Sequence, residues 1–134
     1  MTVALIVVAD DDGDLLALIT LLLQRDGHTV VETADGAAAL RAVREHRPDA
    51  VLSDIDMPLM SGLELCVAIR ADPELRDLPV VLVSGSIMPG DERPEQAQAT
   101  ALLRKPFVRH DLTACLNKAL AGGHQEGRPP TDCP

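Results

Sequence analysis

The feature that most limits the fold of this chain is an alternation of short apolar runs with longer amphipathic segments. Five runs of strand length are rich in apolar or β-branched residues: Val3–Ala9, Thr29–Thr33, Ala50–Ser53, Val80–Ser84 and Thr100–Arg104. Their apolarity is mostly continuous rather than alternating, which is typical of strands covered on both faces, as in a parallel sheet. The sequence therefore predicts a sheet of buried parallel strands.

The segments between these runs have helical spacing. Leucines and isoleucines repeat every three or four residues from Leu15 to Leu23, and a similar stripe runs from Leu112 to Leu120. Ser61 and Glu64 have the spacing of a capping box at the start of a third helix. Five strand–helix units in sequence predict an α/β fold, a doubly wound five-stranded parallel sheet with helices on both faces.

Two regions depart from this pattern. Residues 86–94 contain two prolines and a glycine where a fourth helix is due, so we expect that helix to be short and to begin near Pro94–Glu95. Residues 122–134 have almost no apolar side chains, which predicts a disordered tail or the start of a linker. The expected domain is therefore residues 1–121.

Charge and cysteine content exclude several classes of protein. With 12 Lys and Arg against 21 Asp and Glu, the net charge is −9, and no basic run offers a nucleic-acid surface. The chain has no stretch of about 18 apolar residues, so no membrane span is predicted, and the N-terminus lacks the pattern of a signal peptide. Cys66, Cys115 and Cys133 are widely spaced without a CxxC pair, which favours a reduced, cytoplasmic protein over a disulfide scaffold.

Polar residues follow four of the predicted strands. Asp10 and Asp11 end the first strand, Asp54 the third, Ser84 the fourth and Lys105 the fifth. In open α/β sheets ligands bind at the carboxyl ends of strands, so these side chains should converge. Clustered carboxylates raise one another's pKa unless a cation lies among them, and oxygen ligands suit Mg²⁺. Asp12 and Asp14, by contrast, suit the start of a helix.

These residues resemble those of the response-regulator receiver domain. The likeness rests on the segments 7–12 (VVADDD) and 48–58 (PDAVLSDIDMP) together with Ser61-Gly62, Ser84-Gly85 and Lys105-Pro106-Phe107, and it extends over residues 3–121. The resemblance implies a flavodoxin-like strand order, 2-1-3-4-5. It also implies a role in two-component signalling.

The resemblance also implies a role for each site residue. Asp54 would accept a phosphoryl group from a histidine kinase or phosphotransfer protein. Asp11, Asp54 and the backbone carbonyl of Asp56 would bind Mg²⁺ directly, and Asp10 would bind it through water. Lys105 would pair with a phosphoryl oxygen, and Ser84 would hydrogen-bond the attached group. The carboxylate of Asp56 would tune the lifetime of the phosphoryl group.

Three positions around the predicted fourth helix and fifth strand depart from the family pattern. Leu102 stands where receivers carry a switch Tyr or Phe, Gly85 follows the switch hydroxyl in place of a common Ala, and Gln98 replaces a glycine before the fifth strand. Phe107 is the only aromatic residue of the chain. We expect phosphorylation to change the surface of the fourth helix, fifth strand and fifth helix, and the output to pass through a protein partner or a homodimer.

Two alternatives remain open at this point. A pseudo-receiver, acting as a constitutive interaction module, would explain Leu102 and the proline-broken fourth helix. A haloacid-dehalogenase-type phosphatase would explain the Asp-x-Asp pair at Asp54 and Asp56, but Pro58 and the absence of an acid pair after Lys105 count against it. Mg²⁺ binding separates the receiver from the first alternative, and sustained turnover would indicate the second.

Overall fold

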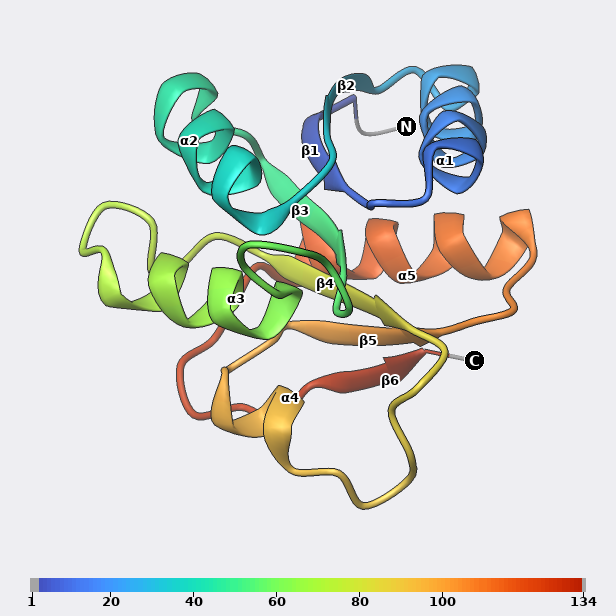
Figure 1. Ribbon diagram of the computed structural model, residues 1–134. Coiled ribbons are helices and arrows are strands. Elements are labelled where there is room, and N and C mark those ends of the chain that lie inside the picture. The colour runs from blue at the N-terminus through green and yellow to red at the C-terminus, as the bar shows by residue number, and fades with distance from the viewer. Residues whose placement is uncertain (1–2, 134) are drawn as a thin grey trace.

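A single parallel sheet forms the centre of the molecule. The computed structural model describes residues 3–133 (Figure 1); Met1 and Thr2 of the expected domain and Pro134 of the expected tail lie outside that range. The strands are β1 (Leu5–Ala9), β2 (Thr29–Thr33), β3 (Ala50–Asp54), β4 (Val80–Ser84), β5 (Ala101–Arg104) and β6 (Thr131–Cys133). Their order is β2-β1-β3-β4-β5-β6, and all pairs are parallel. The predicted five-strand order is confirmed, and a sixth strand extends it.

Helices cover both faces of the sheet. They are α1 (Gly13–Arg25), α2 (Gly36–His46), α3 (Gly62–Ala71), α4 (Arg93–Gln96) and α5 (Arg109–Gly122). The sheet's side chains divide between two aliphatic clusters, one packed under α2 and α3 and the other under α1 and α5. Strands β3 and β4 are buried along their whole length, as their continuous apolar sequence predicts.

Local chemistry sets where the helices begin. The Asp12 carboxylate caps α1 by accepting from the amides of Asp14 and Leu15, and Asp35 caps α2 through the amide of Ala38. Ser61 and Glu64 form the predicted capping box at the start of α3, each side chain accepting from the other's backbone amide. These side-chain acceptors satisfy amides that have no partner within the helix.

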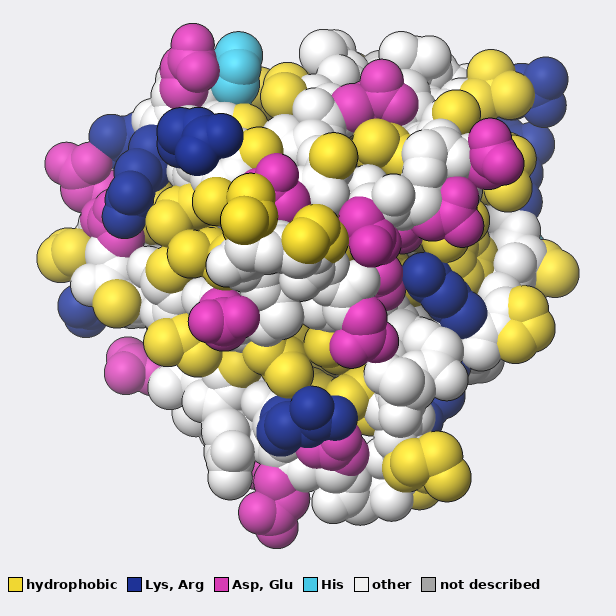
Figure 2. Space-filling view, in the orientation of Figure 1, with side chains coloured by type: hydrophobic (Ala, Val, Ile, Leu, Met, Phe, Trp, Pro, Cys, Tyr) yellow, Lys and Arg dark blue, Asp and Glu magenta, His cyan; other side chains and the backbone are white. Residues whose placement is uncertain are grey.

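The region of α4 is remodelled, as the prolines predict. The helix is one turn long and begins at Arg93, with Pro94 buried in its first turn. Gln98, at the position where the resemblance implies a glycine, has a φ of 60° and so lies in the left-handed region that glycine adopts more easily. Between α3 and α4 lies an apolar groove of about 550 Å³ whose lining includes Leu63 and Val67, and Figure 2 shows hydrophobic side chains exposed there.

The C-terminal segment, residues 123–133, is ordered against the sheet. Residues Thr131–Cys133 form β6, which pairs with β5, and a disulfide joins Cys133 to Cys115 on α5. The predictions of a disordered tail and of reduced cysteines are therefore wrong for this segment and this pair. Composition could not reveal the order, because it comes from backbone pairing and one covalent bond rather than from apolar burial. Cys66 is free and buried, and burial raises the pKa of its thiol to about 11.

Membrane insertion finds no support in the helices. Within residues 3–133, none of them combines the length and the apolar composition that crossing a membrane requires.

Candidate phosphoryl-acceptor site

The site residues meet where the parallel strands end. Asp10 follows β1, Asp54 is the last residue of β3, Ser84 the last of β4, and Lys105 follows β5. The register places Asp54 beside Val83, one residue before Ser84, and the amide of Lys105 donates to the carbonyl of Ser84 at 2.9 Å. Neighbouring strands therefore carry the polar side chains to one edge of the sheet.

Three carboxylates form the acid cluster, which we define as Asp10, Asp11 and Asp54. Each offers an oxygen within 4.8 Å of the other two. Asp10 and Asp54 are 2% and 7% exposed, whereas Asp11 is exposed to solvent. Oxygen donors at this spacing, two buried and one open, fit a hard divalent cation that keeps part of its water shell.

Lys105 supplies the positive charge of the site. Its Nζ lies 3.2 Å from Asp54 Oδ1 and 3.7 Å from Asp10 Oδ2. A single ammonium faces three carboxylates, so the site keeps an excess of negative charge. A further cation would therefore balance the charge of the site.

Burial makes the ionised form of these acids unfavourable. The pKa of Asp54 is raised chiefly by burial and further by the charge of Asp10, although Lys105 opposes both effects. The pKa of Asp10 is likewise raised by burial, against a hydrogen bond from the Asp12 amide and the charge of Lys105. A bound cation would therefore stabilise the ionised form of both acids.

Ser84 is buried and organises the loop between β4 and α4. Its Oγ accepts from the amides of Ser86 and Ile87 at 3.0 and 3.2 Å and lies 3.1 Å from Ser86 Oγ. Ser86 Oγ in turn donates to Asp56 Oδ2 at 2.8 Å. The carboxylate of Asp56 is thus tied to the loop that carries Ser84.

Two supporting residues were not assigned a role from the sequence. A Cβ on Gly62 would collide with the carbonyl oxygen of Asp54, so glycine lets α3 begin directly against Asp54. Arg104 donates to the carbonyl of Ile87 at 2.8 Å and pairs with Asp132 of β6 at 3.3 Å. Gly62 stands in a recognised motif, but no sequence signal identifies the link through Arg104.

Sequence comparisons agree with this geometry. The family model for the response regulator receiver domain matches residues 6–117. The polar-differentiation response regulator DivK of Brucella anthropi is 37% identical over 103 residues, which are 76% of this chain and 84% of that protein. DivK of Brucella ovis is 37% identical over 108 residues, covering 80% of this chain and 87% of its own length.

Solved structures share the fold. The chemotaxis response regulator CheY4 of Vibrio cholerae superposes with a TM-score of 0.82 at 29% identity, covering 87% of this chain and 98% of that one. The receiver domain of a Pseudomonas aeruginosa sensor histidine kinase, described with a magnesium ion coordinated in its active-site cleft, gives 0.82 at 29% identity over 90% and 99%. Motifs, fold and sequence likeness agree, and the chain belongs to the response regulator receiver domain family.

Proposed function

We propose that this chain is a phosphoryl-accepting receiver of a two-component phosphorelay, with Asp54 as the acceptor. The observation that carries the proposal is the position of the Asp54 carboxylate, 3.2 Å from the Lys105 ammonium and within 4.8 Å of carboxylate oxygens of Asp10 and Asp11. A nucleophilic carboxylate, a fixed cation and further oxygen donors are the parts that phosphoryl transfer requires.

The donor set of the acid cluster fits Mg²⁺. Asp11, Asp54 and the backbone carbonyl of Asp56 would bind the ion directly, and Asp10 would bind it through water. When bound, Mg²⁺ neutralises the carboxylates and the oxygens of the incoming phosphoryl group. The raised pKa values of Asp10 and Asp54 support this assignment, because they indicate acids buried with insufficient positive charge.

The transfer itself needs little from the protein beyond position and charge. An Asp54 carboxylate oxygen attacks the phosphorus of a phosphohistidine, the P–N bond breaks, and its electron pair leaves with the imidazole of the donor. Lys105 Nζ lies 3.2 Å from Asp54 Oδ1 and would pair with a phosphoryl oxygen, so charge on the transferring group would be stabilised as it moves.

Ser84 would couple phosphorylation of Asp54 to a movement of the loop that follows β4. Its Oγ accepts from two loop amides, and its own proton, which now faces Ser86 Oγ, would turn to a phosphoryl oxygen on Asp54. Such a hydrogen bond would draw the loop of Ser86 and Ile87 inward and change the surface of α4, β5 and α5. Leu102, buried at 6% exposure, would not take part as a switch aromatic does.

The proposed partners follow from the same chemistry. The phosphoryl donor is a histidine kinase or a phosphotransfer protein, and the output is a downstream protein partner or a homodimer. Net charge −9 disfavours direct contact with nucleic acid. We also propose a cytoplasmic location, where such relays find their donors, with the Cys115–Cys133 disulfide as an exception to the reduced state of most cytoplasmic cysteines.

Acetyl phosphate tests the function without a known kinase. With Mg²⁺ present, intact-mass measurement should detect one added phosphoryl group on the wild type and none on Asp54→Asn. Asp12→Asn is the matched control, since Asp12 caps α1 and lies outside the acid cluster, and it should label like the wild type. A wild type that stays unmodified would contradict the proposal.

The same preparation separates the alternatives. Continuous release of phosphate from p-nitrophenyl phosphate would indicate a phosphatase, and failure to bind Mg²⁺ would indicate a pseudo-receiver. Comparing amide hydrogen exchange over residues 85–105, and oligomeric state, with and without the phosphoryl group then tests the proposed output surface.

A further inference from the structure

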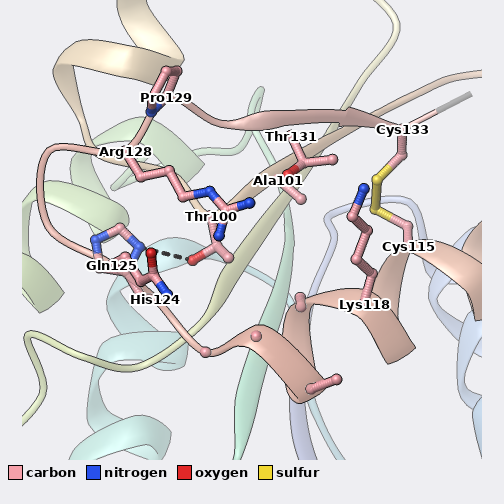
Figure 3. Close-up of a pocket in the computed structure, with 14 residues that line it drawn as sticks. Thr100, Ala101, Cys115, Lys118, His124, Gln125, Arg128, Pro129, Thr131 and Cys133 are labelled. Atoms are coloured by element: carbon pink, nitrogen blue, oxygen red, sulfur yellow. Dashed lines mark hydrogen bonds between the residues drawn. A yellow bond between two sulfur atoms is a disulfide. The ribbon is translucent and has the colours of Figure 1, made fainter.

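A second cavity lies at the start of β5, whereas the acid cluster lies where the strands end. It has a volume of about 320 Å³ and is enclosed by the end of α5, the start of β5 and the C-terminal segment (Figure 3). None of the acid-cluster residues, Ser84 or Lys105 lines it. We call this cavity the tail pocket.

The charge of the tail pocket is opposite to that of the whole chain. Lys118 reaches it from α5 and Arg128 from the C-terminal segment, and no Asp or Glu lines it. Figure 3 shows the Arg128 side chain extending toward Thr100 and Thr131, while Lys118 rises toward the disulfide. Among residues 3–133 neither cation takes part in an ion pair.

The remaining wall is largely apolar. Ala101, Ala119 and Pro129 line the cavity together with the Cys115–Cys133 disulfide. Its volume is at the lower end of the range of about 300–1,000 Å³ found for small-molecule sites. An occupant that suits both the cations and this wall has one anionic end and a short apolar body.

The C-terminal segment is held at several points, so the tail pocket is formed without a ligand. The amide of Thr131 donates to the carbonyl of Thr100 at 3.0 Å, and the disulfide fixes Cys133. At the other end, His124 Nδ1 lies 3.0 Å from Thr100 Oγ1. Arg128 lies between these attachments, and a site formed in advance loses less conformational entropy on binding.

His124 is a buried polar side chain of the wall. Thr100 Oγ1 already accepts from the Val80 amide and Arg70 Nη2, so its own proton goes to His124 Nδ1. The imidazole proton then sits on Nε2, which is buried and has no hydrogen-bond partner within residues 3–133. Burial, with the charge of Arg70, lowers the pKa of His124, which keeps the ring neutral near pH 7. Nε2 is closed to solvent and therefore to the cavity, so the neutral ring leaves Lys118 and Arg128 as the charged groups that an occupant meets.

We infer that the tail pocket is a binding site for a small organic anion with an apolar body, such as a medium-chain carboxylate. Lys118 and Arg128 contact the anionic group, and Ala101, Ala119 and the disulfide contact the apolar part. The site uses no residue of the phosphoryl-acceptor machinery, so this inference stands or falls separately from the proposed function.

Titration with hexanoate, followed by ¹H–¹⁵N correlation spectra of the wild-type chain with its disulfide intact, tests this inference. Saturable shifts should appear at the amides of Ala101, Ala119 and Thr131, while the amide of Asp54 stays in place. Acetate, which lacks the chain, and hexan-1-ol, which lacks the charge, should each bind at least tenfold more weakly.

Charge variants identify the contacts. The double substitution Lys118→Gln/Arg128→Gln should weaken hexanoate binding about tenfold, the scale of losing two partly solvated charge contacts. Lys118 and Arg128 are exposed at the rim, so Arg25→Gln/Arg41→Gln, which removes the same charge from exposed positions outside the pocket, is the matched control and should leave binding unchanged. No saturable shift, equal binding of hexan-1-ol, or an equal loss in both double variants would overturn the inference.

Discussion

The acid cluster and the C-terminal segment are held in opposite ways. At the acid cluster, β1 and β3 bury two carboxylates against one ammonium, and burial leaves their ionised forms unfavourable. The C-terminal segment has few apolar residues to bury, and a disulfide and a three-residue strand fix it. One region therefore carries an excess of negative charge, while the other is fixed by covalent and backbone bonds.

This difference separates a responsive region from a fixed one. Binding of a cation or addition of a phosphoryl group changes the charge of the acid cluster and can therefore shift its conformational equilibrium. The C-terminal segment is fixed by its disulfide and does not respond in this way. Arg104 joins the two regions, because it contacts both the carbonyl of Ile87 in the Ser84 loop and the carboxylate of Asp132 in β6. The fixed segment thus borders the loop that we expect to move.

The largest expected effect comes from releasing the fixed region. Cys133→Ser opens a loop of 18 residues, and the chain-entropy estimate for a loop of this length is about 3 kcal/mol. Urea unfolding should show the free energy of unfolding falling by that order. A reductant should lower the wild type to the level of the variant and leave the variant itself unchanged. Insensitivity of the wild type to reductant would show that the bond does not hold this segment.

The acid cluster should respond in the opposite sense. Without Mg²⁺, Asp54→Asn removes an unfavourable buried charge and should raise the free energy of unfolding at pH 7 by on the order of 1 kcal/mol, the usual scale of a single substitution. Mg²⁺ at ten times its dissociation constant should stabilise the wild type by about 1.4 kcal/mol and the variant less. Urea unfolding with and without the ion measures both.

The pH dependence follows from the same raised pKa. Folded Asp54 holds its proton more tightly than the unfolded chain, whose Asp titrates near 3.8. Its contribution to stability is therefore most favourable at acidic pH and falls as the pH rises from there through the raised value. The difference in stability between Asp54→Asn and the wild type should grow over this window. A constant difference would contradict the assigned cause.

These contrasts explain which features the sequence could predict. The position of the acid cluster could be predicted because each member is an acidic residue at the end of an apolar strand, and parallel strands end at the same edge of a sheet. Helix starts were readable because Ser61, Glu64 and Asp12 act within one turn. The disulfide and β6 were not, because Cys115 and Cys133 are brought together only when the segment doubles back along β5.

The smallest expected effect lies at Gln98. Its φ of 60° costs any residue with a Cβ about 1–2 kcal/mol, and glycine would remove that cost. Glycine also raises the conformational entropy of the unfolded chain, which lowers the free energy of unfolding by about 0.4–1 kcal/mol. Gln98→Gly should therefore stabilise the fold by about 0.5 kcal/mol or slightly more in urea unfolding. Gln96→Gly, within α4, should destabilise it instead. Destabilisation by both would remove the case for strain.

Chemical trapping of the modified residue tests the central claim most directly. After incubation with acetyl phosphate and Mg²⁺, sodium borohydride reduces an aspartyl phosphate to homoserine and releases phosphate. Peptide mass spectrometry then locates the change. We predict homoserine at position 54 and at no other acidic residue, and none when Mg²⁺ is withheld. Homoserine at another position, or an unaltered Asp54 in the presence of Mg²⁺, would contradict the account.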